Sequence, residues 1–256
     1  MRRLVALLTL LSAVSQAGVD AQASQQPVSP QRLLSAYPQF LKVIDTSNLI
    51  WKDGTRTPLS GGRTFTSLSD RLDRPDLNEL LRQPYPGCTP LRTPPYADDP
   101  GRARPAAFFG KIYGNSPAAV KTNLVSVNWF GQKLPFSRVN GANLALEAVA
   151  RDLATQPDLK KYLTPSAGTF LWRVVAGSGR QSAHSWGIAI DLNTRYSDYW
   201  QWEGRKEFAR DIGYKNRMPQ AVVWAFERHG FVWGGRWYHH DTMHFEFRPE
   251  LSYGTC

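Results

Sequence analysis

The chain has 256 residues, of which 42% are hydrophobic and 20% charged, and its formal net charge is +10. This composition is that of a globular chain with a core of ordinary size, so it excludes a small scaffold held together by disulfides. The positive charge suits nucleic acid, an anionic surface or an acidic substrate. Because the sequence shows no RNP-type aromatics, finger spacing or basic helix, we expect no nucleic-acid partner.

The first residues have the pattern of a secretory signal peptide. Two arginines precede an apolar run, Leu4 to Val14, that is too short to span a bilayer. The segments 15–17 and 19–21 both end in alanine and have a small residue two positions earlier. Each therefore offers a cleavage site for a signal peptidase. We expect residues 1–21 to be removed and the protein to be exported to the periplasm or cell wall, without a membrane span. An uncleaved membrane anchor is the alternative.

Residues 22–105 are expected to form an N-terminal arm with short elements only. Ser29 and Pro30 predict a helix start, with Ser29 as the N-cap. The Asp53-Gly54 pair predicts a turn between two short strands. A short helix is predicted at Leu77 to Leu81.

The end of this arm is rich in proline. Seven prolines between Pro84 and Pro105 predict an extended segment on the surface. This segment is either a linker between two lobes or an arm that wraps around the rest of the chain. The apolar residues Tyr85, Leu91 and Tyr96 favour the wrapping arm, since they would anchor it.

The two cysteines, Cys88 and Cys256, favour a disulfide, because an even count in an exported protein is typical of one. Two free thiols are the alternative. Neither cysteine lies in a CxxC pattern or near the histidines, so we expect no catalytic or metal-binding role for them.

Residues 106–256 have the patterns of a compact domain. We expect a helix that starts at Ser116. It is followed by a strand at 125–129, a helix at 142–155, a strand at 169–175, a helix at 219–229 and a short strand at 231–233.

Residues 182–193 contain the first chemically informative motif. If they include a strand, Ile188 and Ile190 point into the core and Asp191 points to the opposite face. His184 lies just before this strand. The motif therefore presents an imidazole and a carboxylate away from the core.

Residues 237–248 repeat this pattern. Phe245 and Phe247 form the core face of a second strand, and His244 lies on the opposite face. Asp241 lies at the mouth of this strand. Pairing the two strands would bring the histidines and carboxylates of both motifs together.

Two neutral imidazoles and one carboxylate are the ligand set of a catalytic zinc that keeps one position open for water. We therefore expect one zinc ion per chain, bound by His184, Asp191 and His244. Asp241 is the expected catalytic base that removes the proton of the attacking water.

Such a zinc-bound water can attack a peptide carbonyl, as in a zinc peptidase. A cation must then stabilise the negative charge that develops on the carbonyl oxygen. Arg173 is the first candidate and Arg180 the second. Substrate contacts are further expected from Ser182, Trp237 and His240, and His240 is placed to orient the neighbouring aspartate or the substrate. Of seven nearby aromatic residues we expect two or three in the groove and the rest in the core: Trp186, Tyr199, Trp200, Trp202, Trp233, Trp237 and Tyr238.

Some of the candidates have simpler interpretations. His229 and His239 are expected to be structural. Glu246 is either a partner of a ligand or a rival base. A serine hydrolase built on Ser182 or Ser185 is set aside, because the chain contains no G-x-S-x-G elbow.

The motifs Ser-x-His-x-x-Gly-x-Ala-x-Asp at 182–191 and Asp-x-Met-His-Phe-Glu at 241–246 resemble the zinc D-Ala-D-Ala carboxypeptidase (VanY-type) family. That family shares its fold with lysostaphin-type endopeptidases and the hedgehog signalling domain. Trp172-Arg173 and the segment 230–235 are similar to one branch of it. The resemblance covers residues 106–251 and leaves the arm unexplained.

The resemblance implies an α+β fold, with a small central antiparallel sheet, helices packed on it and zinc on the open face. It implies the same ligands, His184, Asp191 and His244, and the same base, Asp241. Arg173 resembles the arginine that holds the scissile carbonyl or a substrate carboxylate. Here only ten residues separate Arg173 from His184, whereas the family usually has a longer insertion.

The implied function is an exported, monomeric zinc peptidase that cuts peptidoglycan stem peptides at bonds involving D-amino acids, as a D,D-carboxypeptidase or an endopeptidase. The alternative is a non-catalytic zinc-containing module for wall binding or signalling. The presence of Asp241 argues against that module. A third possibility is that the arm covers the groove and keeps the enzyme latent.

Overall fold

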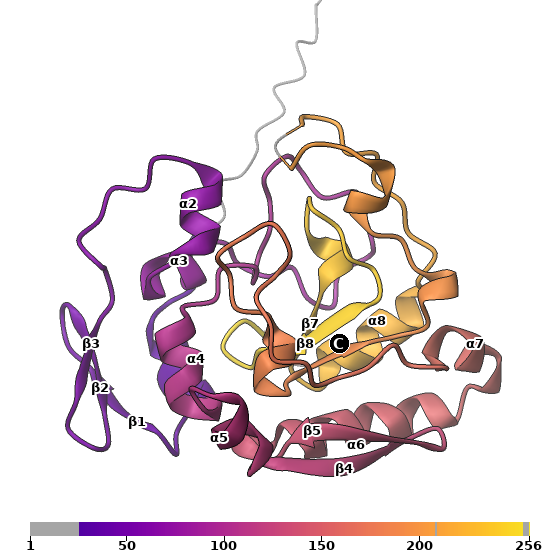
Figure 1. The fold of residues 1–256 in the computed structure, drawn as a ribbon, viewed down its shortest axis with the longest axis horizontal. Coiled ribbons are helices and arrows are strands. Elements are labelled where there is room, and N and C mark those ends of the chain that lie inside the picture. Colours follow the sequence, from indigo (N-terminus) through magenta and orange to yellow (C-terminus); the bar gives the residue numbers. More distant parts are fainter. Residues whose placement is uncertain (1–25, 208, 253–255) are drawn as a thin grey trace, which may run out of the picture.

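Short helices and small antiparallel sheets make up the fold (Figure 1). The computed structural model describes residues 26–207, 209–252 and 256. The mixture confirms the expected α+β class, although the strands form three separate small sheets within the described residues. The predicted signal peptide, residues 1–21, lies outside the described residues and stays a prediction. None of the described helices has the length and apolarity needed to cross a membrane.

The N-terminal part contains a three-stranded sheet and three short helices. They are α1 (Gln31–Ala36), β1 (Leu41–Ile44), β2 (Asn48–Trp51), β3 (Arg56–Pro58), α2 (Leu68–Asp73) and α3 (Leu77–Leu81). The Asp53-Gly54 turn joins β2 to β3 as expected, and Gly54 supplies the positive φ of +83°. The predicted Ser29 cap is wrong: Pro30 is the N-cap of α1, and no side chain caps this helix.

The middle of the chain forms a β hairpin covered by a helix. Its elements are α4 (Ala106–Tyr113), α5 (Pro117–Lys121), β4 (Leu124–Trp129), β5 (Gln132–Ser137), α6 (Ala142–Ala154) and α7 (Lys160–Leu163). The strand predicted at 125–129 and the helix predicted at 142–155 are confirmed. β5 was not predicted, because Pro135 interrupts its strand-like pattern of residues. Proline is nevertheless tolerated on an edge strand such as this one.

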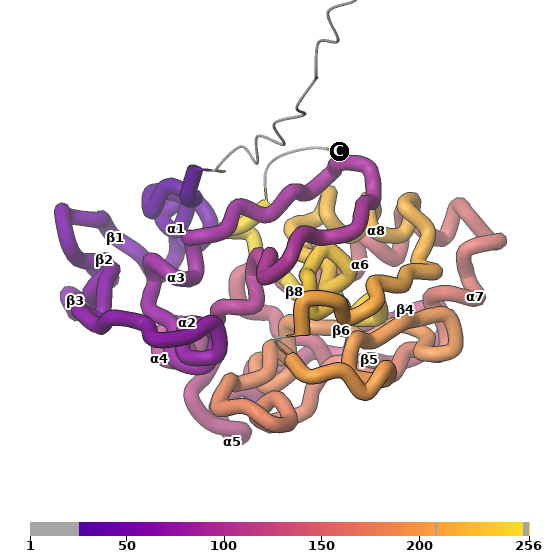
Figure 2. Tube along the Cα trace, turned by 90° about the horizontal axis from the view of Figure 1, so that it is seen from above, coloured from indigo at the N-terminus to yellow at the C-terminus, as the bar shows by residue number. Residues whose placement is uncertain are grey.

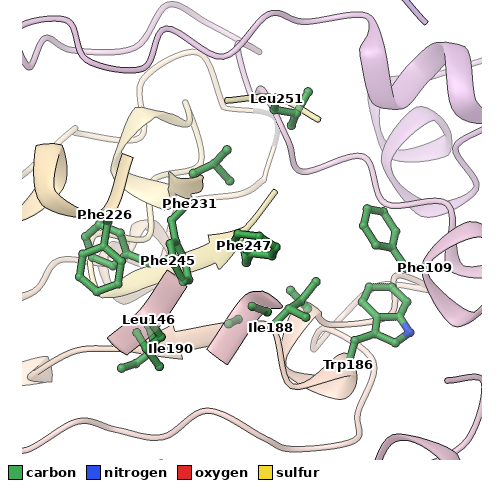
Figure 3. Close-up of a cluster of buried hydrophobic side chains, with 14 of the residues drawn as sticks. Phe109, Leu146, Trp186, Ile188, Ile190, Phe226, Phe231, Phe245, Phe247 and Leu251 are labelled. Carbon is green, nitrogen blue, oxygen red and sulfur yellow. The ribbon is translucent and has the colours of Figure 1, made fainter. Parts of the chain in front are cut away.

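The C-terminal part holds the central sheet, with strand order β6-β8-β7 and antiparallel pairing throughout. Its elements are β6 (Ala189–Asp191), α8 (Gln220–Arg228), β7 (Phe231–Trp233) and β8 (His244–Phe247). Helix α8 packs on one face through Phe226, whose ring lies 4.0 Å from that of Phe245. Figure 3 shows how these rings join Ile188 and Ile190 in one apolar cluster. Short 3-10 turns connect the elements, at Val139–Gly141, Pro157–Leu159, Ala183–Trp186, Thr194–Tyr196, Trp200–Glu203 and Gly234–Arg236.

The strand predicted at Thr169 to Val175 is not formed. Its backbone makes only isolated bridges, from Gly168 to Asp191 and from Val174 to Gln181. The hydroxyl of Ser185 replaces a partner strand, because it accepts from the N–H of Arg173 and donates to its carbonyl, each at 2.9 Å. The β-branched and aromatic pattern therefore marks an extended segment without a regular ladder.

The proline-rich segment 84–105 contains no helix or strand and lies along the C-terminal part, to which it is bonded through Tyr85 and Cys88. Figure 2 shows it running out to the C-terminal residue and returning towards α4. The hydroxyl of Tyr85 donates to the buried carboxylate of Glu227 at 2.6 Å. Leu91 packs against the core, but Tyr96 is 46% exposed and anchors less than expected. The core includes residues from both halves of the chain, from Val28 to Leu251.

The arm is closed by a disulfide between Cys88 and Cys256, which are 168 residues apart and have Cα atoms 4.8 Å apart. We expect the double variant Cys88→Ser, Cys256→Ser to lose about 2–5 kcal/mol of unfolding free energy, since a crosslink restricts the unfolded chain. Urea unfolding of both proteins measures this loss. The native protein unfolded in reductant is the control and should match the variant; equal stability of variant and oxidised native protein would contradict the prediction.

Asp98, at the far end of the arm, has an unfavourable environment for a charge. Burial raises its pKa to about 6, and the neighbouring Asp99 adds to this effect. A raised carboxyl pKa in the folded state means that stability is lost as pH rises from about 4 to about 6. Asp98→Asn should therefore raise the unfolding free energy at pH 7 and have little effect at pH 3.5. Urea unfolding at both pH values tests this, with the exposed Asp158→Asn as control; the same gain at both pH values would refute it.

Candidate active site

The central sheet brings the two sequence motifs together. In the register of β6 and β8, Asp191 lies opposite His244, and Ile190 lies opposite Phe245. Since side chains alternate along a strand, the ligand candidates share one face and the apolar pair shares the other. Gly187 makes the bend before β6 possible: its φ is +65°, and a Cβ there would lie 2.5 Å from Leu124 Cδ2.

Three side chains converge at one point. His184 Nε2 lies 3.2 Å from Asp191 Oδ2 and 3.2 Å from His244 Nδ1. His244 Nδ1 lies 3.0 Å from Asp191 Oδ1. The ligand atoms of all three residues fall within 4.8 Å of one another, as the binding of a single metal ion requires.

The outer nitrogens of the two imidazoles face different groups: that of His184 makes a hydrogen bond, whereas that of His244 lies near a carboxylate beyond hydrogen-bond distance. His184 Nδ1–H donates to the carbonyl of Thr169 at 2.7 Å, which leaves the lone pair of Nε2 directed at the cluster. His244 has the opposite orientation, with Nδ1 in the cluster and Nε2 3.7 Å from Glu246 Oε2. Glu246 is thus placed behind a candidate ligand, so its geometry is that of a partner rather than a rival base.

The charges of the cluster are coupled. Burial opposes ionisation of Asp191, but His184 and the hydrogen bonds from both imidazoles outweigh burial and hold the pKa of this carboxyl well below its usual range. Burial also disfavours protonated His244, yet its hydrogen bond to Asp191 and the negative charges of Asp191 and Glu246 prevail and raise its pKa to about 10. A metal ion must therefore displace a proton that the carboxylates hold on His244.

Asp241 lies beside the cluster and is the fourth residue that the motifs predicted for the site. Burial and, after it, the negative charge of Asp191 raise its pKa to about 6. Its Oδ1 is buried and has no hydrogen-bond partner. A carboxylate oxygen with a free lone pair and a pKa near neutrality is suited to accept and return a proton.

These residues line a cleft of about 350 Å³. Arginines and aromatic rings form its walls: Arg102, Arg104, Arg173, Arg180, Tyr199, Trp200, Trp202 and Trp237. Four aromatic residues line the cleft rather than the expected two or three. Trp186 and Trp233 are in the main core, and Tyr238 packs in a small cluster with Trp200 and Ile212.

The four arginines differ in their partners. Arg180 is paired with Glu207 at 3.0 Å and with Asp73 at 3.4 Å. Arg102 is paired with Asp99 at 3.2 Å. Within the described residues Arg173 forms no ion pair, and its side chain is exposed at the cleft. Arg173 is therefore the cation most available to a substrate, and Arg180 is held by carboxylates.

Of the other residues predicted to contact the substrate, some line the cleft and one does not. Ser182 and Trp237 line the cleft. His240 does not: it is buried behind the cleft wall, where its ring lies 5.2 Å from that of Tyr214. His229 bonds to Asp152 at 2.9 Å, away from the cleft, and His239 bonds to buried Asp99 at 2.7 Å, so each has the partner that a structural histidine needs.

Arg102 and Arg104 were missed from the sequence. Both belong to the arm, which was assigned to a separate N-terminal part ending at residue 105, and they reach the cleft only because the arm folds back. Arg104 Nε donates to Glu246 Oε2 at 2.8 Å, so the arm contacts the residue behind His244. The only signal was the pair of arginines at alternating positions after Gly101.

This arm contact predicts a large effect on stability. Arg104→Met would leave the fully buried Glu246 with Arg248 as its remaining cation, at 3.1 Å. We expect a loss of about 3 kcal/mol of unfolding free energy, because a fully buried carboxylate loses one of the two cations that compensate its charge. Urea unfolding measures the loss. The control Arg74→Met breaks an exposed pair with Asp70 and should change stability far less; equal effects would show that the buried pair is not special.

Comparison with known proteins identifies the class. Residues 176–247 match the family model described as D-alanyl-D-alanine carboxypeptidase. The match contains His184, Asp191, Asp241 and His244, and it confirms the resemblance drawn from the two motifs. Over this segment the chain is similar to that family. Arg173 and the arm lie outside the match, and neither a curated protein nor a solved structure matches the chain.

Proposed function

We propose that the protein is an exported zinc-dependent peptidase that hydrolyses peptidoglycan stem peptides at bonds involving D-amino acids. The convergence of His184, Asp191 and His244 beside Asp241, in a cleft with an available arginine, carries this proposal. The match to a D-alanyl-D-alanine carboxypeptidase family supports the substrate class.

The residues present fit a zinc ion. His184 would contribute Nε2, His244 Nδ1 and Asp191 a carboxylate oxygen, which leaves a fourth position for water. Zinc bound there would lower the pKa of this water to about 7 and polarise the scissile carbonyl. The hydrogen bond from His184 to the carbonyl of Thr169 keeps the correct tautomer.

Asp241 would act as the general base and then as the general acid. Its unpartnered Oδ1 accepts a proton from the attacking water and later donates it to the leaving amine. Burial keeps its pKa near 6, so proton transfer is feasible in both directions near neutral pH.

Arg173 would hold the negative oxygen that develops on the carbonyl, or a carboxylate of the substrate. Arg102 and Arg180, which are ion-paired with carboxylates, also lie in the cleft walls. They add positive potential there, which favours the carboxylate-rich stem peptide. The aromatic residues exclude water from the reacting bond.

The test is product analysis. The protein is incubated with purified peptidoglycan, with and without a chelator, and the products are identified by mass spectrometry. We expect shortened stem peptides that are absent when the chelator is present and return when zinc is added. Cleavage that persists without metal would overturn the mechanism. Zinc binding without any cleavage would favour the non-catalytic module.

A further inference from the structure

A second hollow, of about 440 Å³, lies on the other side of the wall that borders the cleft. That wall is the hairpin of residues 172–182. In it the N–H of Ser182 donates to the carbonyl of Arg173 at 3.1 Å, and the N–H of Val175 donates to the carbonyl of Arg180 at 2.8 Å. The hollow is lined by the hairpin, by α4 and by the turn that follows the hairpin: Ala106, Ala107, Gly110, Lys111, Asn115, Trp172, Gln181 and Trp186.

The alternation of side chains along the hairpin divides them between the two hollows. Arg173, Arg180 and Ser182 line the cleft, whereas Trp172 and Gln181 line the second hollow. Leu171 and Val174, on the same ribbon, are 58% and 54% exposed. A substrate that lies across the hairpin would contact both hollows and cover this apolar surface.

The hollow offers aromatic surface and neutral hydrogen-bond donors. Trp186 lies against Phe109 at the edge of the core (Figure 3), with ring centroids 5.0 Å apart, and its indole N–H has no acceptor among the described residues. Gln181 Nε2 also lacks an acceptor. Trp172 is half-buried and adds a second indole. A fitting ligand therefore brings apolar faces and acceptors such as hydroxyl and acetamido oxygens.

Charge distinguishes the occupants of the two hollows. The guanidinium groups of the hairpin all face the cleft. The single lysine of the second hollow, Lys111, is paired with Asp53 at 2.8 Å. An acidic peptide is thus attracted to the cleft, and the second hollow suits an uncharged group.

We propose that the second hollow is a subsite for an N-acetylated amino sugar of the glycan strand that carries the stem peptide. The inference rests on the proposed function for the identity of the polymer. The sugar ring packs on the half-buried Trp172, and its hydroxyl and acetamido oxygens accept from Gln181 and from the indole N–H of Trp186. The protein accordingly recognises peptide attached to glycan better than free peptide.

Tetra-N-acetylchitotetraose, titrated into the metal-free protein by calorimetry, tests this subsite without requiring catalysis. We expect saturable binding that becomes at least about tenfold weaker in Trp172→Ala, because the stacking surface is lost. The matched variant Trp202→Ala removes an exposed tryptophan of the cleft instead and should leave sugar binding unchanged. Trp172→Phe should retain most of the binding.

If Trp172→Ala does not fold, Gln181→Leu replaces it in the same titration. This variant should also bind the sugar more weakly. No binding by the intact protein, or a loss in Trp202→Ala alone, would overturn the subsite. So would slower hydrolysis of a sugar-free stem peptide by Trp172→Ala, since a peptide would then occupy the hollow. Sugar binding without peptidase activity would support the subsite and contradict the proposed function.

Discussion

Asp241→Asn is expected to lower kcat for stem-peptide hydrolysis by about 10²- to 10⁴-fold, the usual contribution of a general acid–base. The amide has nearly the same shape as the carboxylate, but it cannot accept a proton from water. Since the side chain of Asp241 bonds to none of the three candidate ligands, zinc content should remain unchanged. Hydrolysis rates and metal content of the same samples measure both effects.

The control for Asp241→Asn is Glu203→Gln, which removes an exposed carboxylate that pairs with Lys215. This control should hydrolyse stem peptides at the native rate. Activity of Asp241→Asn close to that of the native protein would exclude Asp241 as the base. A parallel loss of zinc would instead assign it to metal binding.

His184→Ala should abolish stoichiometric zinc binding. Removing one of three ligands leaves only Asp191 and His244, whose ligand atoms lie 3.0 Å apart, to hold the ion. We expect the dissociation constant for zinc to rise by more than about 100-fold, because loss of a hydrogen-bonding partner of a ligand alone costs 10- to 100-fold. Metal content after dialysis and competition with a chromogenic chelator measure the change.

A matched control for His184→Ala is His229→Ala. It removes an imidazole that bonds to Asp152 and lies outside the cleft. This variant should keep one zinc ion per chain. If His184→Ala retains a full equivalent of zinc, the ligand assignment is wrong.

The candidate site was accessible from the sequence because strands alternate. Apolar residues at every second position predict that Asp191 and His244 lie on the polar face of their strands, and the register of β6 and β8 puts them opposite each other. The same local rule predicted α6 and β4, whose apolar stripes are long enough to be unambiguous.

Where a position depends on distant partners, the sequence was a poor guide. The segment after Thr169 has strand-like residues, but a serine hydroxyl takes the place of a ladder. Arg104 reaches Glu246 across 142 residues, a contact that no local pattern encodes. His240 carries the same side chain as His244, yet it is buried against Tyr214 because its neighbours turn it away from the cleft.

The disulfide constrains the order in which the molecule can be completed. Cys88 precedes every residue that lines the cleft, the first of which is Arg102, whereas Cys256 follows all of them. A chain that emerges from a ribosome or a translocation pore exposes the first thiol long before its partner. Until Cys256 has emerged, Cys88 has no partner. Covalent closure of the arm therefore comes after the emergence of every residue that lines the cleft.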